Sequence, residues 1–292
     1  MDLPHKPNPE HLHLGNNRMS GPIPNSVGDL DMLIDLRLND NAFTGAFPVE
    51  LTNLPRLEIL LLENNLLEGS LPREIVSLSS LRVLRLHANE LFGPLPRLAS
   101  LEALEQLHLD QNAFSGTIPD PIGPPSLREL ILSRNTLTGS IPAGIFSLSK
   151  LDVLRLGSNR LTGTLPPIVG NLAYTRVLSV SHNFLNGSVP EEISGLVRLR
   201  SLSLSNNMLS GSLPEGLGQL SLLQKLFLQD NELTGSLPSD VILLKALRQM
   251  ILEGNEFTGS VPRYFCDLKM EVLSADCSEP EAKIACSCCS CS

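Results

Sequence analysis

The sequence predicts a repeat solenoid, an elongated domain in which successive short coils stack on one another. Three observations lead to this fold. An asparagine recurs every 24 residues, apart from two consecutive spacings of 23. A glycine lies four residues after each of these asparagines, and a proline lies seven residues after it. A fixed period of this length is typical of repeat architectures. The recurring asparagines are Asn17, Asn41, Asn65, Asn89, Asn112, Asn135, Asn159, Asn183, Asn207, Asn231 and Asn255.

Each coil is expected to contain a short strand that ends just before the recurring asparagine. Aliphatic residues lie five and three positions before it, as Leu60 and Leu62 do before Asn65. This alternation is the pattern of a strand with one face buried. The inward leucines should form a continuous apolar core. The residues two, four and six positions before each asparagine should point out of the concave face and form a continuous surface.

The asparagine, the glycine and the proline have different expected roles. An asparagine side chain both donates and accepts hydrogen bonds, so it can satisfy backbone groups of neighbouring coils that water cannot reach. We therefore predict a ladder of stacked asparagines, in which the loss of one buried member costs roughly 1–3 kcal/mol. The glycine supplies a position without a Cβ at the next bend. The proline fixes φ and removes a donor on the convex side.

The repeated string Asn-x-Leu-x-Gly-x-Ile/Leu/Val-Pro, as in residues 159–166, resembles the plant-type leucine-rich repeat. The resemblance extends from residue 9 to about residue 275. It implies an α/β-type leucine-rich repeat solenoid, a right-handed curved superhelix with a parallel β-sheet on its concave face and short 3-10 or turn segments on its convex face. Such repeats serve receptor ectodomains, inhibitors of wall-degrading enzymes and other surface proteins, so the resemblance leaves the function open.

Three segments are expected along the chain. Residues 1–8 are polar and proline-rich, lack the apolar stretch of a signal peptide, and should form a disordered or truncated tail. Residues 9–275 should hold eleven repeats and a degenerate twelfth, and residues 276–292 a cysteine-rich cap. Plant-type repeats usually begin with a cysteine-paired cap, and its lack leads us to expect a truncated N-terminus. The alternative is a genuine cytosolic start.

The repeats are uniform except within residues 90–127, where two coils are one residue shorter. The second of these coils carries Pro119-Asp120-Pro121. The missing residues are expected on the convex side, where they would change the local curvature. A binding feature carried by this loop is the alternative.

All six cysteines fall within the last 27 residues. An even number, in a chain that has no cysteine elsewhere, suits a disulfide-stapled cap formed in an oxidising compartment. A soft metal ion bound by thiolates is an alternative, although structural zinc prefers pairs separated by two to four residues. Free thiols are the third possibility. The tail resembles that of leucine-rich repeat proteins of diatoms and related algae. The cysteines are Cys266, Cys277, Cys286, Cys288, Cys289 and Cys291.

Charge and motifs exclude several classes of function. A net charge of −9 disfavours general binding to nucleic acid or to an anionic membrane. No run of 18 apolar residues is present, so no membrane span is encoded. Kinase, Walker, Gly-x-Ser-x-Gly and His-Glu-x-x-His motifs are all absent. We therefore predict no catalytic residues, no cofactor and no metal. One glycosylation sequon, at Asn186, is compatible with secretion.

Polar side chains gather on the expected concave surface of the first repeats. His87, His108 and Asp110 fall on neighbouring strands, which raises the possibility of a metal site or of a hydrolase. Exposed strand positions must carry polar residues in any case, and the two histidines lie in offset columns. We therefore predict a recognition patch instead of a catalytic centre. Its members are Arg37, Arg85, His87, His108, Asp110 and Arg155.

The sequence thus predicts a non-catalytic recognition module that binds a protein, a peptide or a glycan through its concave face. We expect an extracellular or cell-surface protein that is a monomer or a weak dimer; a cytoplasmic location is the alternative. Two other functions remain open, a ligand-sensing ectodomain fragment of a receptor-like kinase and an inhibitor of wall-degrading enzymes.

Overall fold

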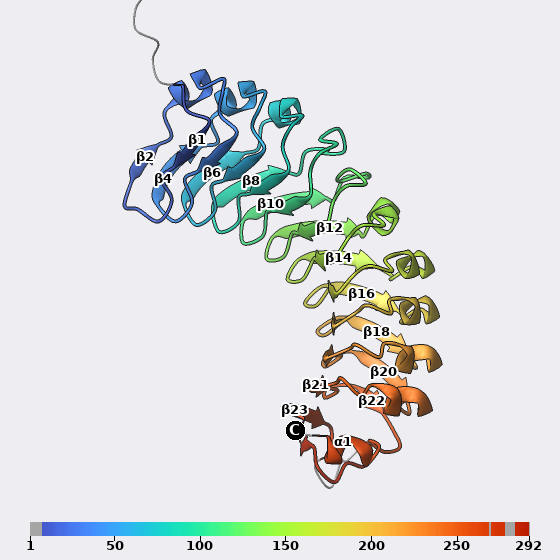
Figure 1. Ribbon diagram of the computed structural model, residues 1–292. Coiled ribbons are helices and arrows are strands. Elements are labelled where there is room, and N and C mark those ends of the chain that lie inside the picture. Colours follow the sequence, from blue (N-terminus) through green and yellow to red (C-terminus); the bar gives the residue numbers. More distant parts are fainter. Residues whose placement is uncertain (1–7, 269, 278–283, 292) are drawn as a thin grey trace, which may run out of the picture. The chain divides into compact units, whose positions relative to one another are not determined.

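The computed structural model describes residues 8–268, 270–277 and 284–291. The expected N-terminal tail, except for Asn8, therefore lies outside the described residues. The chain forms two compact units, residues 1–137 and residues 138–292. Within each unit, consecutive coils stack in the order of the sequence (Figure 1).

The first unit contains two parallel sheets whose strands follow the chain order. Partners in the first sheet are one repeat apart, as in the pairing of Leu36 with Leu60. The strands of the first sheet are β1 (His11–His13), β3 (Asp35–Arg37), β5 (Ile59–Leu61), β7 (Val83–Arg85), β9 (Gln106–His108) and β11 (Glu129–Ile131). Those of the second sheet are β2 (Ser20–Pro22), β4 (Ala42–Ala46), β6 (Leu66–Ser70), β8 (Glu90–Pro94) and β10 (Ala113–Thr117). The 3-10 helices are η1 (Asn25–Asp29), η2 (Val49–Asn53) and η3 (Arg73–Ser77).

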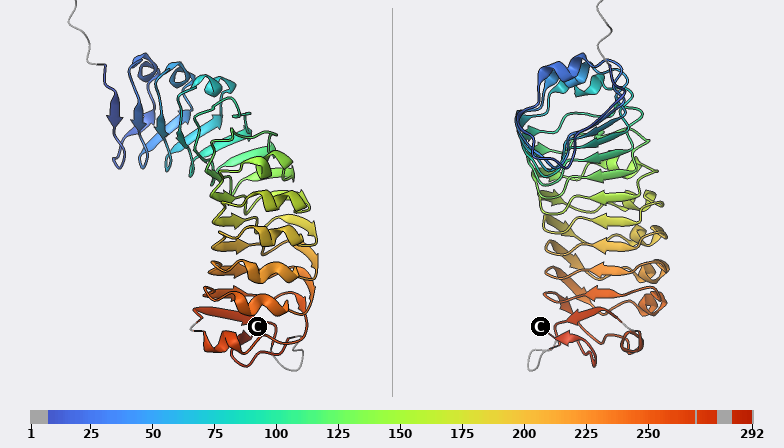
Figure 2. Two further views of the ribbon diagram at one scale, coloured as in Figure 1. Left: turned by 45° about the vertical axis from the view of Figure 1, so that its right-hand side comes forward. Right: turned by 60° about the vertical axis from the view of Figure 1, so that its left-hand side comes forward.

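The second unit repeats this plan, and its coils are seen from two sides in Figure 2. Its first sheet contains β13 (Val153–Arg155), β15 (Val177–Ser179), β17 (Ser201–Ser203), β19 (Lys225–Phe227), β21 (Gln249–Ile251), β23 (Val272–Ala275) and β24 (Ser290–Cys291). Its second sheet contains β14 (Arg160–Gly163), β16 (Phe184–Gly187), β18 (Met208–Gly211), β20 (Glu232–Gly235) and β22 (Glu256–Phe257). Its helices are η4 (Ala143–Ser147), η5 (Pro167–Asn171), η6 (Glu191–Gly195), η7 (Glu215–Gln219), η8 (Ser239–Leu243) and α1 (Tyr264–Asp267). Strand β12 (Thr136–Ser140) crosses the boundary, and its residues 138–140 pair with β14.

The parallel sheet and the 3-10 segments of the predicted fold are confirmed within each unit. The second sheet is an addition, because the sequence led us to expect only turns after the asparagine. These strands are hard to recognise in the sequence, since each is short and all but β22 contain or end at the repeat glycine, which has a positive φ, as at Gly69 (84°). The two shortened coils have no 3-10 helix after β8 or β10.

The core of each coil is aliphatic. In the third coil Leu60, Leu62, Leu67, Ile75 and Leu78 are completely buried. Burial of each such side chain stabilises the fold by roughly 1.5–3 kcal/mol. Since every coil contributes equivalent residues, the apolar interior continues from coil to coil within each unit.

The repeat asparagine bonds its own coil to the preceding one. Asn65 Nδ2 donates to the carbonyl oxygens of Leu62, in its own coil, and Leu38, one coil earlier, each at 3.1 Å. Asn65 Oδ1 accepts a hydrogen bond from the Phe43 amide at 3.0 Å. One side chain that is 7% exposed thus satisfies backbone groups of two coils, which removes the desolvation penalty that these groups would otherwise carry.

The residue just before each repeat asparagine has a left-handed backbone. Its φ lies between 53° and 58° in ten coils, and Gly254 (68°) takes this position in the eleventh. Asparagine, aspartate and glycine tolerate this conformation best, which explains why they recur here. His182 also occupies this position. The ten non-glycine residues are Asn16, Asp40, Asn64, Ala88, Gln111, Arg134, Ser158, His182, Asn206 and Asp230.

The C-terminal cysteines form three disulfides, as predicted for a stapled end. Cys266 on α1 is bonded to Cys288, Cys277 to Cys291, and Cys286 to Cys289. Strand β24 extends the first sheet of the second unit by pairing with β23. The cap buries Phe265 completely and leaves Ile284 only 2% exposed. A covered end of this kind protects the apolar interior of a solenoid from water.

Candidate functional site

The predicted patch residues of the first unit come together on neighbouring strands. Arg85 on β7 and His108 on β9 are direct partners in the first sheet. His87 and Asp110 follow these strands and are also side by side, since the Ala88 amide donates to the Asp110 carbonyl at 3.0 Å. Arg37 lies on β3, two strands away from Arg85. Arg155 lies on β13, in the second unit.

A chain of hydrogen bonds connects the side chains of β7, β9 and β11. Arg85 Nη2 donates to Gln106 Oε1 at 2.8 Å, and Gln106 Nε2 donates to Glu129 Oε1 at 3.2 Å. The other Glu129 oxygen, Oε2, lies 2.8 Å from His108 Nε2. The carboxylate that contacts His108 is therefore Glu129, and sequence reasoning missed both it and Gln106. Both lie six positions before a repeat asparagine, in a column already expected to face outward.

His108 is the most buried of the patch histidines, with 8% of its surface exposed. Burial lowers the pKa of its imidazole, and the nearby charges of Arg85 and His87 act in the same direction. The hydrogen bond and the charge of Glu129 oppose this shift without cancelling it. The lowered pKa thus favours the neutral imidazole, which donates to Glu129 when its proton is on Nε2.

Three buried polar atoms in this region have no hydrogen-bond partner. They are Glu63 Oε2, Arg85 Nε and His87 Nδ1. Glu63 is 7% exposed, and burial raises the pKa of its carboxyl group, although His87 and Arg85 act against the shift. The Asn64 amide donates to the His87 carbonyl at 3.0 Å, which places Glu63 beside His87. An unpaired buried polar group costs roughly 1–3 kcal/mol, so these atoms are available for a partner.

Aliphatic side chains border the polar residues on both sides. In the first sheet, Leu61, Arg85, His108 and Ile131 form one row across four adjacent strands. Leu61 and Ile131 at its two ends are half-buried. We define the central patch as these two aliphatic residues together with the polar residues between them, which are Glu63, Arg85, His87, Gln106, His108 and Glu129.

The geometry does not bring His87, His108 and Asp110 together as one group. The His87 and His108 rings are tilted by 55° with centroids 6.1 Å apart, and Glu129 occupies Nε2 of His108. Asp110 accepts a hydrogen bond from Gln111 Nε2 at 3.3 Å. A group of three potential metal ligands does occur in the part of the chain that the structure describes, at His11, His13 and Asp35.

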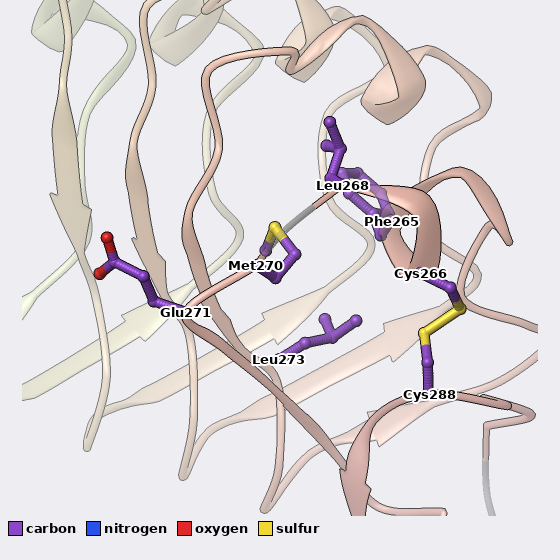
Figure 3. A pocket seen from close by; sticks show the side chains of 7 residues that line it. All are labelled: Phe265, Cys266, Leu268, Met270, Glu271, Leu273 and Cys288. Atoms are coloured by element: carbon purple, nitrogen blue, oxygen red, sulfur yellow. A yellow bond between two sulfur atoms is a disulfide. The ribbon is translucent and has the colours of Figure 1, made fainter.

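A hollow in the C-terminal cap lies beside the Cys266–Cys288 disulfide (Figure 3). Its volume is about 390 Å³, and Phe265, Leu268, Met270 and Leu273 supply most of its lining. Among the described residues that line it, Glu271 is the charged one; its side chain points away from the others and accepts a hydrogen bond from Gln249 at 2.8 Å. We assign no chemistry to this hollow.

Comparison with protein families identifies the repeat. One leucine-rich repeat model matches residues 149–209, and another matches residues 8–30, 103–124 and 126–148. Among curated proteins, none matches the chain significantly.

Several solved structures resemble the chain. A TDR receptor is 33% identical with a TM-score of 0.81, over 88% of this chain and 49% of the receptor. The Arabidopsis receptor kinase HAESA, solved with the peptide hormone IDA and the co-receptor SERK1, is 29% identical with a TM-score of 0.72, over 88% and 48%. The chain thus spans about half the length of these receptors. A plant ice-binding protein is 28% identical with a TM-score of 0.64, over 87% of this chain and 83% of that protein.

None of the helices in the described residues has the length and apolar character that crossing a membrane requires. The repeat matches, the two parallel sheets and the receptor-like neighbours agree with one another. The chain thus contains leucine-rich repeats that resemble those of plant receptor ectodomains, and it ends in a disulfide-bonded, cysteine-rich segment.

Proposed function

We propose that this chain is a non-catalytic recognition module that binds a peptide in extended conformation across the central patch. The observation that carries this proposal is the set of three buried atoms without a partner, Glu63 Oε2, Arg85 Nε and His87 Nδ1, on adjacent coils. HAESA, a structural neighbour, was solved with a peptide hormone. That neighbour favours a peptide over a glycan as the class of ligand.

The patch defines what the ligand must offer. Glu63 Oε2 needs a donor and Arg85 Nε needs an acceptor, whereas His87 Nδ1 can do either, depending on the tautomer. Neighbouring strands lie about 4.8 Å apart, so the ligand must alternate donors and acceptors over a short distance. A peptide backbone does this. Apolar ligand side chains would then lie against Leu61 and Ile131.

Selection from a random linear peptide library on the immobilised full chain tests this proposal. Enriched peptides should lose at least about tenfold in affinity, or ~1.4 kcal/mol, on Arg85→Ala and on His87→Ala. Arg73→Ala is the matched control, since this arginine side chain on η3 is 94% exposed. Peptides that bind Arg85→Ala as well as the original chain would refute the site, and binding of neutral glycans alone would refute the ligand class.

We further propose an extracellular location. Three disulfides join all six cysteines, and such bonds persist in oxidising compartments. Counting thiols in denatured protein purified from its natural source, under non-reducing conditions, tests this. No free thiol is expected, and six free thiols would contradict it.

A second candidate function, binding to ice, rests on the second sheet of the second unit. Its outward columns three and five positions after each repeat asparagine carry only small uncharged polar side chains. All are exposed except the half-buried Ser210. A flat parallel sheet repeats at about 4.8 Å, so these groups form a regular array that could hold ordered water. They are Thr138, Ser140, Thr162, Thr164, Asn186, Ser188, Ser210, Ser212, Thr234, Ser236, Thr258 and Ser260.

The plant ice-binding protein, which this chain matches over most of both lengths, favours this candidate. Its test is an assay of ice recrystallisation with the purified chain. Thr162→Tyr and Thr234→Tyr should abolish inhibition by breaking the flat array, whereas Ser221→Tyr, at an exposed turn before β19, should not. Growth of ice crystals equal to that in buffer would exclude the function.

A further inference from the structure

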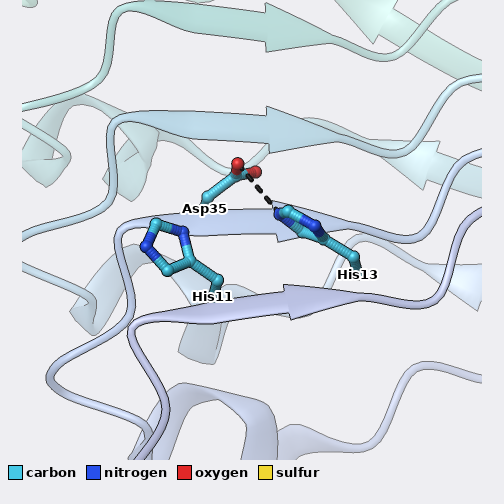
Figure 4. Close-up of side chains that lie close together, drawn as sticks. All are labelled: His11, His13 and Asp35. Carbon is cyan, nitrogen blue, oxygen red and sulfur yellow. Dashed lines mark ion pairs between the residues drawn. The ribbon is translucent and has the colours of Figure 1, made fainter.

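A second cluster of functional groups lies at the first strand of the first unit. His11 and His13 occupy alternate positions of β1, so their side chains share one face of the sheet. Asp35 on β3 is the direct partner of His11. Figure 4 shows both imidazole rings beside the Asp35 carboxylate.

The potential ligand atoms converge. One nitrogen of each histidine and one oxygen of Asp35 all lie within 4.8 Å of one another. His13 Nε2 is 3.0 Å from Asp35 Oδ2, and the two rings meet edge to face with centroids 5.9 Å apart. Zinc–nitrogen and zinc–oxygen bonds are about 2.0–2.2 Å long. Rotation of the two exposed histidines is therefore enough to bring all three atoms onto one ion.

Asp35 is fixed in place before any ion binds. Its residue is 5% exposed. Oδ1 accepts a hydrogen bond from Arg37 Nε at 3.0 Å, and Oδ2 accepts one from Arg37 Nη2 at 2.9 Å. The two hydrogen bonds from Arg37 thus hold the carboxylate in one orientation, as outer-shell partners orient the ligands of metal sites.

We propose that His11, His13 and Asp35 bind a divalent transition metal ion, with Zn²⁺ as the best match. Two imidazoles and one carboxylate suit zinc, with a remaining position for water. Magnesium and calcium prefer oxygen ligands and fit this set poorly. On binding, the ion would replace the proton that His13 Nε2 shares with Asp35 Oδ2. The positive charge of Arg37 nearby opposes the ion, so we expect weaker binding than at a structural zinc site.

Isothermal titration of the full chain with ZnCl₂ alone tests the proposal. One saturable site is expected. His11→Ala and His13→Ala should each weaken it at least about tenfold, a typical loss when a zinc site is perturbed. His182→Ala, at another exposed position, is the matched control and should bind as the original chain does. Both target histidines are exposed, so their removal should leave the fold intact, which circular dichroism would verify.

A second measurement separates ligation from loose association. Co²⁺ in place of zinc should give visible absorption bands of a tetrahedral or five-coordinate site, and these bands should vanish in His13→Ala and in Asp35→Asn. Absence of saturable zinc binding would overturn the proposal. So would binding that His13→Ala leaves unchanged, or that His182→Ala weakens equally. Because none of the three ligands belongs to the central patch, failure here leaves the proposed peptide site untouched.

Discussion

His108 and Glu129, on adjacent strands of the first unit, face each other with Nε2 and Oε2 2.8 Å apart. Only 11% of the histidine side chain is exposed. The pair therefore joins a largely buried imidazole to the one carboxylate that contacts it. Since burial and neighbouring cations lower the pKa of His108 while Glu129 raises it, the pair makes the first unit sensitive to mild acid.

The first prediction concerns this pair. The pKa of His108 lies below its ordinary value in the folded chain, so the unfolded chain binds more protons between the two values. The free energy of unfolding should therefore be highest above the pKa of the unfolded chain, about 6.5. It should fall as the pH drops from there towards the pKa of the folded chain. Thermal unfolding at pH 7.5 and pH 5 should show a loss that His108→Gln reduces. An unchanged pH dependence in His108→Gln would contradict this.

The same pair predicts the effect of Glu129→Gln. Glu129 raises the pKa of His108, so its neutral replacement should lower that pKa further, as nuclear magnetic resonance of the imidazole would report. Asp110→Asn is the control, because Asp110 bonds to Gln111 and not to His108. A fall of equal size in both variants would show that net charge, and not the contact, sets the pKa.

The third prediction concerns Glu63. Burial raises the pKa of this carboxyl group above its ordinary value of 4.5. At pH values between the unfolded and the folded pKa, the folded chain therefore keeps a proton that the unfolded chain has lost. The free energy of unfolding falls as the pH rises through this range. Glu63→Gln should therefore stabilise the chain at pH 7.5, by ~1 kcal/mol, and much less at pH 4. Urea unfolding at both pH values measures this. Glu68→Gln, at an exposed position of β6, should have little effect at either pH.

The fourth prediction compares two repeat asparagines. Asn65→Ala should cost about 1–3 kcal/mol in the free energy of unfolding, because it leaves the buried Phe43 amide without a partner. It also removes one of the two asparagine donors to each of the Leu38 and Leu62 carbonyl groups. Asn17→Ala should cost less. Asn17 is exposed, and its side chain donates to the carbonyl groups of Leu14 and Gly15 in its own coil. Water can replace these bonds. Equal losses in urea unfolding would argue against a role in joining coils.

The last prediction uses the left-handed position before each repeat asparagine. Ala88 has a φ of 53°, a conformation that costs an L-residue roughly 1–2 kcal/mol. Ala88→Gly removes this cost but adds freedom to the unfolded chain, so a net gain of about 0.5 kcal/mol is expected. Ala143→Gly, at the start of η4 where φ is not positive, should instead destabilise. Thermal unfolding of both variants decides the sign.

Much of the fold could be predicted because every coil repeats the same local sequence pattern. Leu60 and Leu62 alternate with outward residues, and Asn65 ends the strand, in a pattern that recurs at a fixed spacing. One coil therefore explains the others. The spacing also identified the columns on the outer face of the first sheet, and with them Arg85 and His108 as neighbours. The clustering of the cysteines predicted a stapled end.

What the sequence by itself determined is thus the period, the parallel first sheet and the choice of faces, since these depend on residues close together in the chain. Only the tertiary structure decided which side chains meet across coils and which of their atoms remain unpaired. The pairing of His108 with Glu129, the unpartnered oxygen of Glu63, the approach of His11 and His13 to Asp35, and the disulfide connectivity all belong to this second group. Apart from the Cys286–Cys289 bridge, which spans 3 positions, these contacts join residues 14 to 24 positions apart, and their strength depends on burial, which no local pattern records.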